Sequence, residues 1–336
     1  MKPLAITMGC PVGIGPEIIL RFFASQSTIA AKQPVVVVGD PGVIEWCSRA
    51  LAIPAAIVAW QPGDRVAQGC IPVFRPDDFP VLQPEQLVWG SPDQQTGRAM
   101  ARCIEAAVTG ILQGHFSGMA TCPITKKALN EAGYAFPGHT EMLASLCHSS
   151  DYAMMMAGDR LRVTLVTIHT ALRDVPSLLT PEKIHNLIVM TGQSLRQDFG
   201  IAAPRLAVAA LNPHAGEAGM FGCEEETVIR PAILRAEREG WQVSGPFPPD
   251  TVFHKAVSGA FDGVVCMYHD QGLIPFKLLH FKDGVNVTIG LPIVRTSVDH
   301  GTAYDIAGRG LADPASLSAA VNMATLIIAN RNRAGR

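Results

Sequence analysis

The chain has 336 residues, of which 48% are hydrophobic and 17% charged, and its 27 basic side chains nearly balance 29 acidic ones. This length and apolar content predict two domains or one large one and exclude a disordered chain. The small net charge argues against nucleic acid or an anionic membrane as the main partner, and no apolar run approaches the roughly 20 residues of a membrane helix.

The amino terminus and the cysteines indicate a cytoplasmic protein. The opening residues, MKPLAITMGC, lack the long apolar core and the small-residue cleavage site of a signal peptide, and they are typical of a first strand. Eight cysteines are scattered along the chain without a CxxC pair. In a chain of this length we expect them to be reduced thiols and not a disulfide framework.

Short apolar runs rich in Val and Ile recur along the chain. They predict buried strands over LAITMG (4–9), PVVVVGD (34–40), LRVTLVTIH (161–169), RLAVAALNPH (205–214), DGVVCMYHD (262–270) and GVNVTIG (284–290). Runs that are continuously apolar, and do not alternate, are typical of parallel strands covered on both faces. Within an irregular stretch from 60 to 95, an edge strand is expected over Ile71–Phe74.

Helical patterns lie between these strands. They cover 96–112, 180–200 and 223–240. The second has Thr180 as N-cap and Pro181 at N1, and Pro231 is expected to kink the third. Strands that alternate with helices indicate the α/β class.

Three predicted strands lead into a histidine: His169, His214 and His269. Ligands of open parallel sheets bind outside the carboxyl ends of the strands, so these imidazoles can converge although they are far apart in sequence. Three neutral imidazoles with one open position are a usual way to hold catalytic zinc. The alternative is three unrelated, hydrogen-bonded histidines, because long-range spacing is weaker evidence than a local HExxH motif.

The segment after the first strand, GCPVGIGPE (9–17), resembles the start of a dinucleotide fingerprint. The third glycine position is occupied by Ile18, so the fingerprint is incomplete. We interpret the segment as a Gly-rich turn into a helix, with Pro16 at N1 and Glu17 in the first turn. The backbone N–H groups of such a turn can face an anion or a polar ligand.

Polar side chains embedded in apolar sequence are candidates for substrate contacts. In FPGHTEML (136–143), His139 can donate to a substrate, whereas Thr140 is expected to cap a helix. Further along, Lys277 and Arg295 lie in apolar surroundings and need an anionic partner. A phosphate or a carboxylate would suit both.

Several motifs together carry a resemblance that runs through nearly the whole chain. They are TMGCPVGIGPE (7–17), TCPITK (121–126), PGHTE (137–141), LNPHAGE (211–217), MYHDQG (267–272), GVNVTIGLPIVRTSVDHGTA (284–303) and DIAG (305–308). The chain resembles the 4-hydroxythreonine-4-phosphate dehydrogenase family of vitamin B6 biosynthesis, with its D-threonate and D-erythronate 4-phosphate dehydrogenase relatives. The stretch HGTAYDIAG (300–308) is also similar to the adenosine-binding loop of isocitrate and isopropylmalate dehydrogenases.

The resemblance implies a fold and an assembly. The fold would be two α/β/α domains with a cleft between them, as in isocitrate and isopropylmalate dehydrogenases. The first domain would comprise 1–125 and 297–336, and the second 126–296. The protein would be a homodimer with its active site at the subunit interface.

The resemblance also implies roles for individual residues. A divalent metal, Zn with Mg, Co or Mn as alternatives, would be held by His169, His214 and His269, with the site shared between subunits. Substrate would be bound by His139, Thr140, Lys277, Asn286 and Arg295, and the base would be Asp250, Asp270 or Lys277. NAD would lie on His300, Gly301, Thr302 and Ala303. NAD is expected over NADP because the loop from 299 to 307 has no Arg or Lys and Asp305 would repel a 2′-phosphate.

The implied reaction is the NAD-dependent, metal-dependent oxidation, with decarboxylation, of 4-hydroxythreonine 4-phosphate or a similar phosphorylated C4 hydroxy acid. SDYAMMM (150–156), PPDTVF (248–253) and FKLLHFKDGVNVT (276–288) are at least as similar to the D-threonate and D-erythronate 4-phosphate enzymes. An aromatic cis-dihydrodiol is a more distant alternative. The chain has Cys10 where the family usually carries an acidic residue and Cys122 where it carries a small one.

Two rivals belong to other classes. A two-domain binding protein could capture a small anion without chemistry, but it would not explain the HGTAYDIAG loop. A metal-dependent hydrolase or aldolase could use the same three histidines, and it would turn over without nicotinamide.

Overall fold

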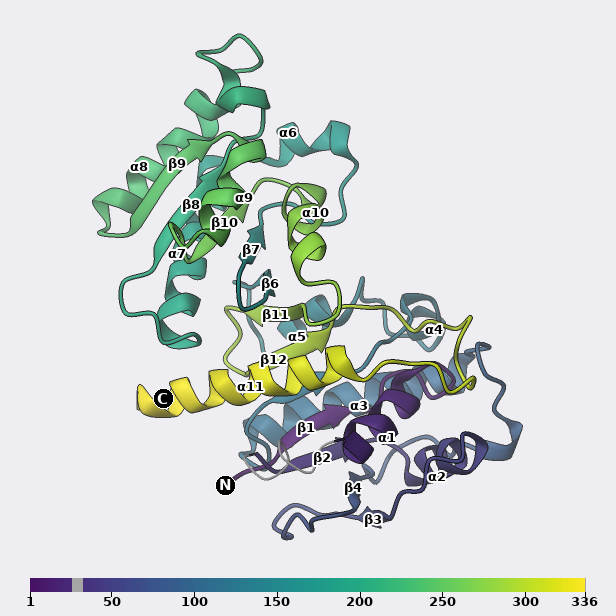
Figure 1. Cartoon of the computed structure of the whole chain (residues 1–336). Coiled ribbons are helices and arrows are strands. Elements are labelled where there is room, and N and C mark those ends of the chain that lie inside the picture. Colours follow the sequence, from purple (N-terminus) through teal and green to yellow (C-terminus); the bar gives the residue numbers. More distant parts are fainter. Residues whose placement is uncertain (26–32, 336) are drawn as a thin grey trace. The chain divides into compact units, whose positions relative to one another are not determined.

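The computed structural model describes residues 1–25 and 33–335 (Figure 1). The chain forms two compact units: unit 1 comprises Met1–Ser150 and Leu291–Ile328, and unit 2 comprises Asp151–Gly290 and Ala329–Arg336. Each unit is a β-sheet with helices packed on it, so the predicted α/β class is confirmed. The two domains expected from the sequence, with boundaries after residues 125 and 296, stay a prediction.

The sheet of unit 1 is parallel throughout. Its order is β3-β4-β2-β1-β5-β12, formed by Ile57–Ala59, Ile71–Phe74, Val35–Val38, Leu4–Thr7, Met119–Thr121 and Arg295–Val298. The strand predicted over Ile71–Phe74 is present, but its position at the edge was wrong. The short strand β3, which has only three residues and no clear apolar pattern, pairs with its outer side.

Helices surround this sheet. They are α1 (Gly15–Ser25), α2 (Pro41–Ala50), α3 (Gln94–Leu112), α4 (Lys126–Glu131), α5 (His139–Leu146) and α11 (Ala315–Arg333), with a 3-10 turn η1 (Pro84–Gln86). The predicted helix over 96–112 begins at Gln94, because Asp93 and Thr96 form a reciprocal capping box. The Asp93 carboxylate accepts from the Thr96 N–H at 2.8 Å, and the Asp93 N–H donates to the Thr96 hydroxyl at 2.8 Å.

The sheet of unit 2 is mixed. Its order is β11-β6-β7-β10-β8-β9, formed by Val285–Ile289, Ala153–Ala157, Arg162–Leu165, Gly263–Cys266, Arg205–Ala209 and Gln242–Phe247. The strands β7, β10, β8 and β9 are parallel, whereas β6 runs antiparallel to both β7 and β11. The parallel pairing expected for GVNVTIG is therefore wrong on this side, because a tight turn after Ala157 folds β6 back onto β7.

The helices of unit 2 are α6 (Val175–Leu178), α7 (Pro181–Gln197), α8 (Arg230–Arg238), α9 (Pro249–Val257) and α10 (His269–Leu279), with short turns η2 (Leu172–Asp174), η3 (Pro213–Gly216) and η4 (Glu225–Ile229). The predicted cap is confirmed: the Thr180 hydroxyl accepts from the Lys183 N–H at 3.2 Å. The predicted helix over 223–240 begins with the π-type turn η4, and α8 follows with Pro231 in its first turn. Proline has no N–H, so it fits a first turn and not a helix interior.

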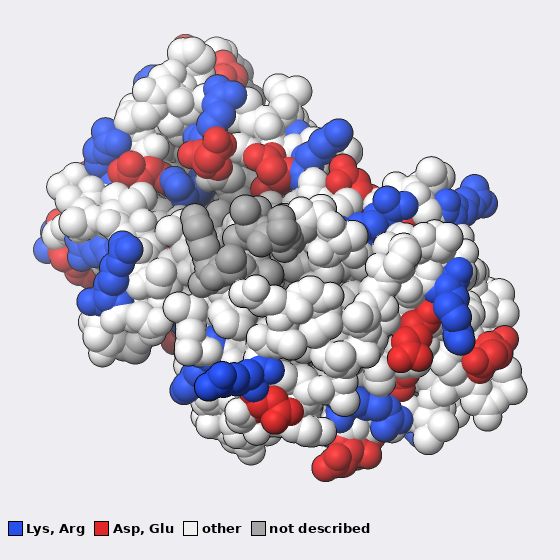
Figure 2. Space-filling view, turned by 60° about the horizontal axis from the view of Figure 1, so that its bottom comes forward, with Lys and Arg blue, Asp and Glu red and all other residues white. Residues whose placement is uncertain are grey.

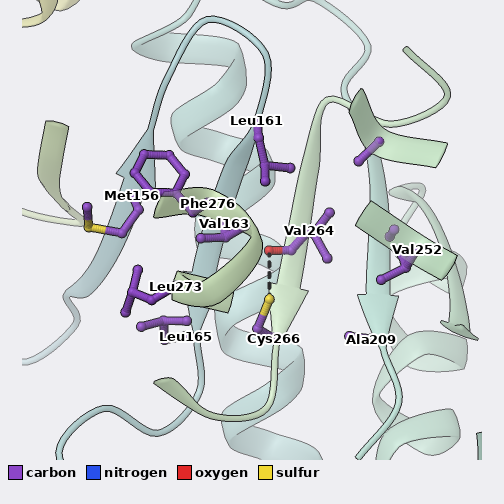
Figure 3. Close-up of a cluster of buried hydrophobic side chains, with 12 residues drawn as sticks. Met156, Leu161, Val163, Leu165, Ala209, Val252, Val264, Cys266, Leu273 and Phe276 are labelled. Carbon is purple, nitrogen blue, oxygen red and sulfur yellow. Dashed lines mark hydrogen bonds between the residues drawn. The ribbon is translucent and has the colours of Figure 1, made fainter. Parts of the chain in front are cut away.

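A cluster of buried apolar side chains fixes α9 and α10 on the sheet of unit 2 (Figure 3). Its members are Met156, Leu161, Val163, Leu165, Ala207, Ala209, Val252, Ala256, Val264, Cys266, Leu273 and Phe276. Burying a side chain such as Leu273 or Phe276 stabilises the fold by about 1.5–3 kcal/mol. Because α10 begins at His269, this packing also sets the position of that histidine.

Several predictions from composition concern the surface and the thiols. All eight cysteines are free, as predicted, and five of them are buried. Burial raises the pKa of Cys47 to about 12, so that thiol stays protonated at neutral pH. Figure 2 shows Lys and Arg side chains interspersed with Asp and Glu on the face in view. Within residues 1–25 and 33–335, no helix is both long and apolar enough to span a bilayer.

Candidate active site

Three strand ends of unit 2 lie side by side. The strands β7, β10 and β8 are neighbours and parallel, with β10 in the middle, so their carboxyl ends meet at one edge of the sheet. The pairing continues past β7, where the N–H of Val166 donates to the Cys266 carbonyl at 2.9 Å. His169, His214 and His269 follow these three strands, so the topology brings the predicted metal ligands to the same edge.

Two of the three imidazoles face each other. The ring centroids of His169 and His269 are 6.0 Å apart, and the His269 side chain is 40% exposed. Nδ1 of His269 lies 2.7 Å from a carboxylate oxygen of Asp270. A carboxylate on one ring nitrogen orients the imidazole and leaves the other nitrogen available as a ligand.

The third imidazole sits on a strained turn. His214, Ala215, Glu217 and Ala218 all have φ between 41° and 55°, a left-handed conformation that non-glycine residues rarely adopt. Such strain is concentrated at functional sites, where the surrounding structure holds it in place. The ring of His214 lies 6.1 Å from that of Phe221, and its ligand atoms do not form a close group with those of His169 and His269 in the described part of one chain.

A buried glutamate holds this turn, and sequence reasoning missed it. Glu225 is 2% exposed, and one of its oxygens accepts from the N–H groups of Leu211 and Asn212 at 2.8 and 2.7 Å. Its other oxygen accepts from the Asn212 side chain at 3.0 Å. Residues 224 to 226 are all glutamates, and nothing in the local sequence distinguishes the middle one.

A buried glutamine links two strand ends and was also missed. The Gln271 carboxamide oxygen accepts from the Met267 N–H at 2.7 Å, and its nitrogen donates to the Ala210 carbonyl at 2.6 Å. Met267 follows β10 and Ala210 follows β8, so one side chain ties the segments that precede His269 and His214. The MYHDQG motif contains this glutamine, which is the third residue of α10. Its place in that motif was the sequence signal that could have identified it.

Helix α10 carries several of the predicted residues. His269 and Asp270 begin it, and Lys277 lies half-buried near its end. Asp250 is exposed in the first turn of α9. On β11, the Asn286 carboxamide nitrogen lies 3.2 Å from the Met154 sulfur, and its oxygen is buried without a hydrogen-bond partner among the described residues.

In unit 1, Arg295 and His139 form an electrostatically coupled pair. Arg295 is 2% exposed at the start of β12, and its guanidinium donates to the Thr121 hydroxyl at 2.9 Å. Burial lowers the pKa of Arg295 to about 9, and the Glu141 carboxylate opposes this shift. Burial, and then the positive charge of Arg295, hold the pKa of His139 well below its usual value, so this imidazole is neutral.

The helix cap expected at Thr140 was wrong. Thr140 does not cap α5, because the helix already begins at His139 with Gly138 as its N-cap. Gly138 takes the extended conformation before the helix, which places Thr140 inside the first turn.

The predicted cofactor loop, residues 299–308, packs against the Gly-rich turn after β1. The N–H of Ile14 donates to the Thr302 carbonyl at 3.2 Å, and a Cβ at Gly13 would lie 3.2 Å from that same oxygen. The Tyr304 hydroxyl donates to the Cys10 sulfur at 3.3 Å. The turn and the loop therefore form one surface, although nearly 300 residues separate them.

A buried carboxylate anchors the end of this loop. Glu17 is 0% exposed, and its Oε1 accepts from the Ala312 N–H at 2.9 Å and from the Arg21 guanidinium at 3.1 Å. Arg21 also donates to the Gly310 carbonyl. In the loop itself, Nδ1 of His300 lies 3.0 Å from the Gly301 carbonyl oxygen, and its Nε2 is buried without a hydrogen-bond partner in the described residues.

Known proteins resemble the chain over nearly its whole length. It is 55% identical over 329 residues to a 4-hydroxythreonine-4-phosphate dehydrogenase of Desulfosudis oleivorans, covering 96% of this chain and 95% of that one. It is 44% identical over 328 residues to the D-threonate 4-phosphate dehydrogenase of Salmonella typhimurium, covering 96% and 98%.

Solved structures agree with these relatives. A 4-hydroxythreonine-4-phosphate dehydrogenase of Klebsiella pneumoniae superposes with a TM-score of 0.89 at 42% identity, covering 97% of this chain and 98% of that one. A terephthalate 1,2-cis-dihydrodiol dehydrogenase of Burkholderia xenovorans gives 0.67 at 28% identity, covering 97% and 98%. Residues 30–324 match the profile of the family described as pyridoxal phosphate biosynthetic protein PdxA. The chain therefore belongs to the PdxA family and is a dehydrogenase, as its motifs predicted.

Proposed function

We propose that the chain catalyses the NAD-dependent, divalent-metal-dependent oxidation, with decarboxylation, of 4-hydroxythreonine 4-phosphate or a closely similar phosphorylated C4 hydroxy acid. The observation that carries the proposal is the set of three histidines that follow the neighbouring parallel strands β7, β10 and β8. Relatives named for 4-hydroxythreonine 4-phosphate and for D-threonate 4-phosphate support the substrate class.

The donor set fits a divalent ion. Three imidazoles suit Zn²⁺, with Co²⁺, Mn²⁺ or Mg²⁺ as alternatives. Two of the rings, those of His169 and His269, already face each other, and Asp270 orients the second of them. When bound, the ion supplies Lewis acidity to the substrate oxygens.

A homodimer with the active site at the subunit interface completes the proposal. His214 does not join the other two histidines within the described part of one chain, which supports a site shared between subunits. Ile274, Leu278 and Phe281 are 68%, 85% and 77% exposed at helical spacing along and just beyond α10. An exposed apolar stripe of this kind is typical of a protein interface, and a second copy would cover it.

Polar side chains would carry out the proton transfer and bind the substrate. Asp250, Asp270 or Lys277 takes the proton of the substrate hydroxyl, directly or through water, which typically contributes 10²–10⁴-fold. NAD, when bound, would supply the hydride acceptor. The residues that would bind the anionic substrate are His139, Thr140, Lys277, Asn286 and Arg295. A cation such as Lys277 also favours the negative charge that develops as carbon dioxide leaves.

The cofactor loop supports NAD over NADP. His300, Gly301, Thr302 and Ala303 would contact the adenosine half, and the buried ring nitrogen Nε2 of His300 has no hydrogen-bond partner among the described residues. The loop from 299 to 307 has no Arg or Lys to hold a 2′-phosphate, and Asp305 is exposed and would repel it. The eight free thiols support a cytoplasmic location.

A panel of phosphorylated C4 acids, assayed with NAD and with NADP, tests the proposal. We expect NADH formation, with the highest kcat/KM on 4-hydroxythreonine 4-phosphate. A higher value on D-threonate or D-erythronate 4-phosphate would favour the alternative substrate, and a cis-dihydrodiol serves as the distant comparison. Turnover without nicotinamide, or no NADH from any of these acids, would contradict the proposed function.

A further inference from the structure

A second group of ligand-type side chains lies in unit 2, away from the three histidines. It comprises Asp159 in the turn between β6 and β7, His280 at the end of α10, and Asp283 in the loop before β11. One ring nitrogen of His280 and one carboxylate oxygen of each aspartate lie within 4.8 Å of one another. Nothing in the proposed reaction uses this group.

The imidazole of His280, at the centre of this group, is buried because the backbone of the neighbouring turn passes close to it. His280 is 2% exposed, and a Cβ at Gly158 would lie 2.5 Å from its ring, so only glycine allows the turn to approach so closely. Nε2 has no hydrogen-bond partner among the described residues and points toward Asp159, whose Oδ1 is 3.6 Å away. A buried ring nitrogen without a partner is unfavourable, because it has lost its hydrogen bonds to water and gained none in return.

We propose that Asp159, His280 and Asp283 bind a divalent transition-metal ion such as Zn²⁺. Two atoms that share a zinc ion lie roughly 3.4 Å apart, because each is about 2.0–2.2 Å from the metal in a tetrahedral site. Nε2 of His280 lies 3.6 Å from Oδ1 of Asp159, and one ring nitrogen of His280 and one oxygen of each aspartate lie within 4.8 Å of one another. The aspartate side chains are 80% and 59% exposed, so they can close on the ion while water fills the remaining position.

The competing arrangement is a protonated imidazole held between two carboxylates. Charge-assisted hydrogen bonds of this type are normally about 2.7–2.9 Å long. Both separations here are longer, and the Nε2 contact does not qualify as a hydrogen bond. Nδ1 is hydrogen-bonded to Asp283 at 3.3 Å, whereas the unpartnered Nε2 is the nitrogen that a metal ion would occupy.

An ion here would tie together elements that carry the proposed substrate contacts. Its ligands join the turn after β6 to the carboxyl end of α10 and to the loop that leads into β11. Helix α10 carries Lys277, and β11 carries Asn286. The ion would be structural, and it depends on none of the residues assigned to the active-site metal.

The test uses the full-length His169→Ala/His269→Ala chain, in which the active-site ligands are removed, and Zn²⁺ alone as the probe. After gel filtration, this background should retain about one equivalent of zinc by mass spectrometry, and zinc should raise its melting temperature by about 5 °C. Adding Asp159→Asn or Asp283→Asn, which change exposed side chains, should abolish both effects. His280→Gln should do the same.

Matched controls are His254→Gln and Glu237→Gln, an exposed imidazole and an exposed carboxylate of the same unit. Both should leave zinc content and the melting shift unchanged. The proposal is overturned if the background chain holds no more zinc than the Asp159→Asn chain. It is also overturned if zinc leaves the melting temperature of the background unchanged, which would identify a proton-held ion pair.

Discussion

The two units differ in how far the polar side chains beside their strands are exposed to solvent. In unit 1, the charged group at the start of β12, Arg295, is 2% exposed and bonded to Thr121. In unit 2, His169 and His214 are exposed, and the side chain of His269 is 40% exposed. The first group is buried among contacts within the chain, whereas the histidines of the second are partly or largely open to solvent.

This difference in burial indicates which substitutions should change both the free energy of unfolding and the activity, and which should change activity almost alone. A buried charge such as Arg295 loses water on folding, so its replacement alters the free energy of unfolding as well as binding. An exposed histidine contributes little to folding, so its replacement should affect function almost alone. Substitutions at buried and at exposed positions should therefore be distinguishable by measuring kinetics and unfolding side by side.

The largest effect is expected at the exposed histidines. Each of His169→Ala, His214→Ala and His269→Ala should lower kcat/KM by at least about 10²–10³-fold, because Lewis-acid stabilisation of several kcal/mol is lost. The free energy of unfolding should change by less than about 0.5 kcal/mol in metal-free buffer. Steady-state kinetics, metal analysis and thermal melts give the three quantities. Full metal occupancy in all three variants would refute the assignment of these ligands.

The buried arginine should behave differently. Arg295→Met should raise the KM for a phosphorylated substrate by roughly 10- to 150-fold, since a charge-assisted contact of about 1.5–3 kcal/mol is lost. Because burial lowers the pKa of Arg295 to about 9, the charged form is disfavoured in the fold, and Met should leave stability equal or higher.

Lys277→Ala is the matched change on unit 2. It should raise the same KM by a similar factor and change the free energy of unfolding by a different amount from Arg295→Met, because Lys277 is only half-buried near the end of α10. If neither variant changes the KM, both side chains are structural and the phosphate binds elsewhere.

The pH dependence of stability provides the third contrast. Burial and the charge of Arg295 hold the pKa of His139 well below 6.5 in the folded chain. Below about pH 6.5 the unfolded chain takes up a proton that the folded chain does not. As the pH is lowered, the free energy of unfolding therefore decreases by at most about 1.4 kcal/mol per pH unit.

His139→Gln should flatten this fall, and the exposed His254→Gln should not. Denaturant unfolding of the three proteins between pH 7.5 and about 5 measures the difference between their slopes. Parallel slopes for parent and His139→Gln would mean that His139 is protonated in the folded state.

The smallest effect is expected in the cofactor loop. His300→Ala should raise the KM for NAD by roughly 2- to 12-fold, because one neutral contact contributes about 0.5–1.5 kcal/mol. The KM for the phosphorylated acid should stay the same. Tyr304→Phe, which removes only the hydroxyl that donates to Cys10, is the conservative companion. A strong preference for NADP, or an unchanged KM for NAD in the His300 variant, would show that adenosine binds elsewhere.

Local sequence was sufficient for the elements with strong patterns. The six apolar runs became strands, and Thr180 with Pro181 began α7 as predicted, because burial and helix capping depend on neighbouring residues. Short strands with weak patterns, such as β3 and β5, were missed, since three residues do not establish a period. The family and its dehydrogenase activity also followed from motifs read along the chain.

Tertiary structure alone decided the rest. The order β7-β10-β8 placed three distant histidines at one edge, and the fold assigned buried roles to Glu17, Glu225 and Gln271. Apart from the place of Gln271 in the MYHDQG motif, nothing in the local sequence separates these three from ordinary surface residues. Each has at least one partner 13 or more residues away, and a hydrogen bond between distant segments exists only once packing has brought them together.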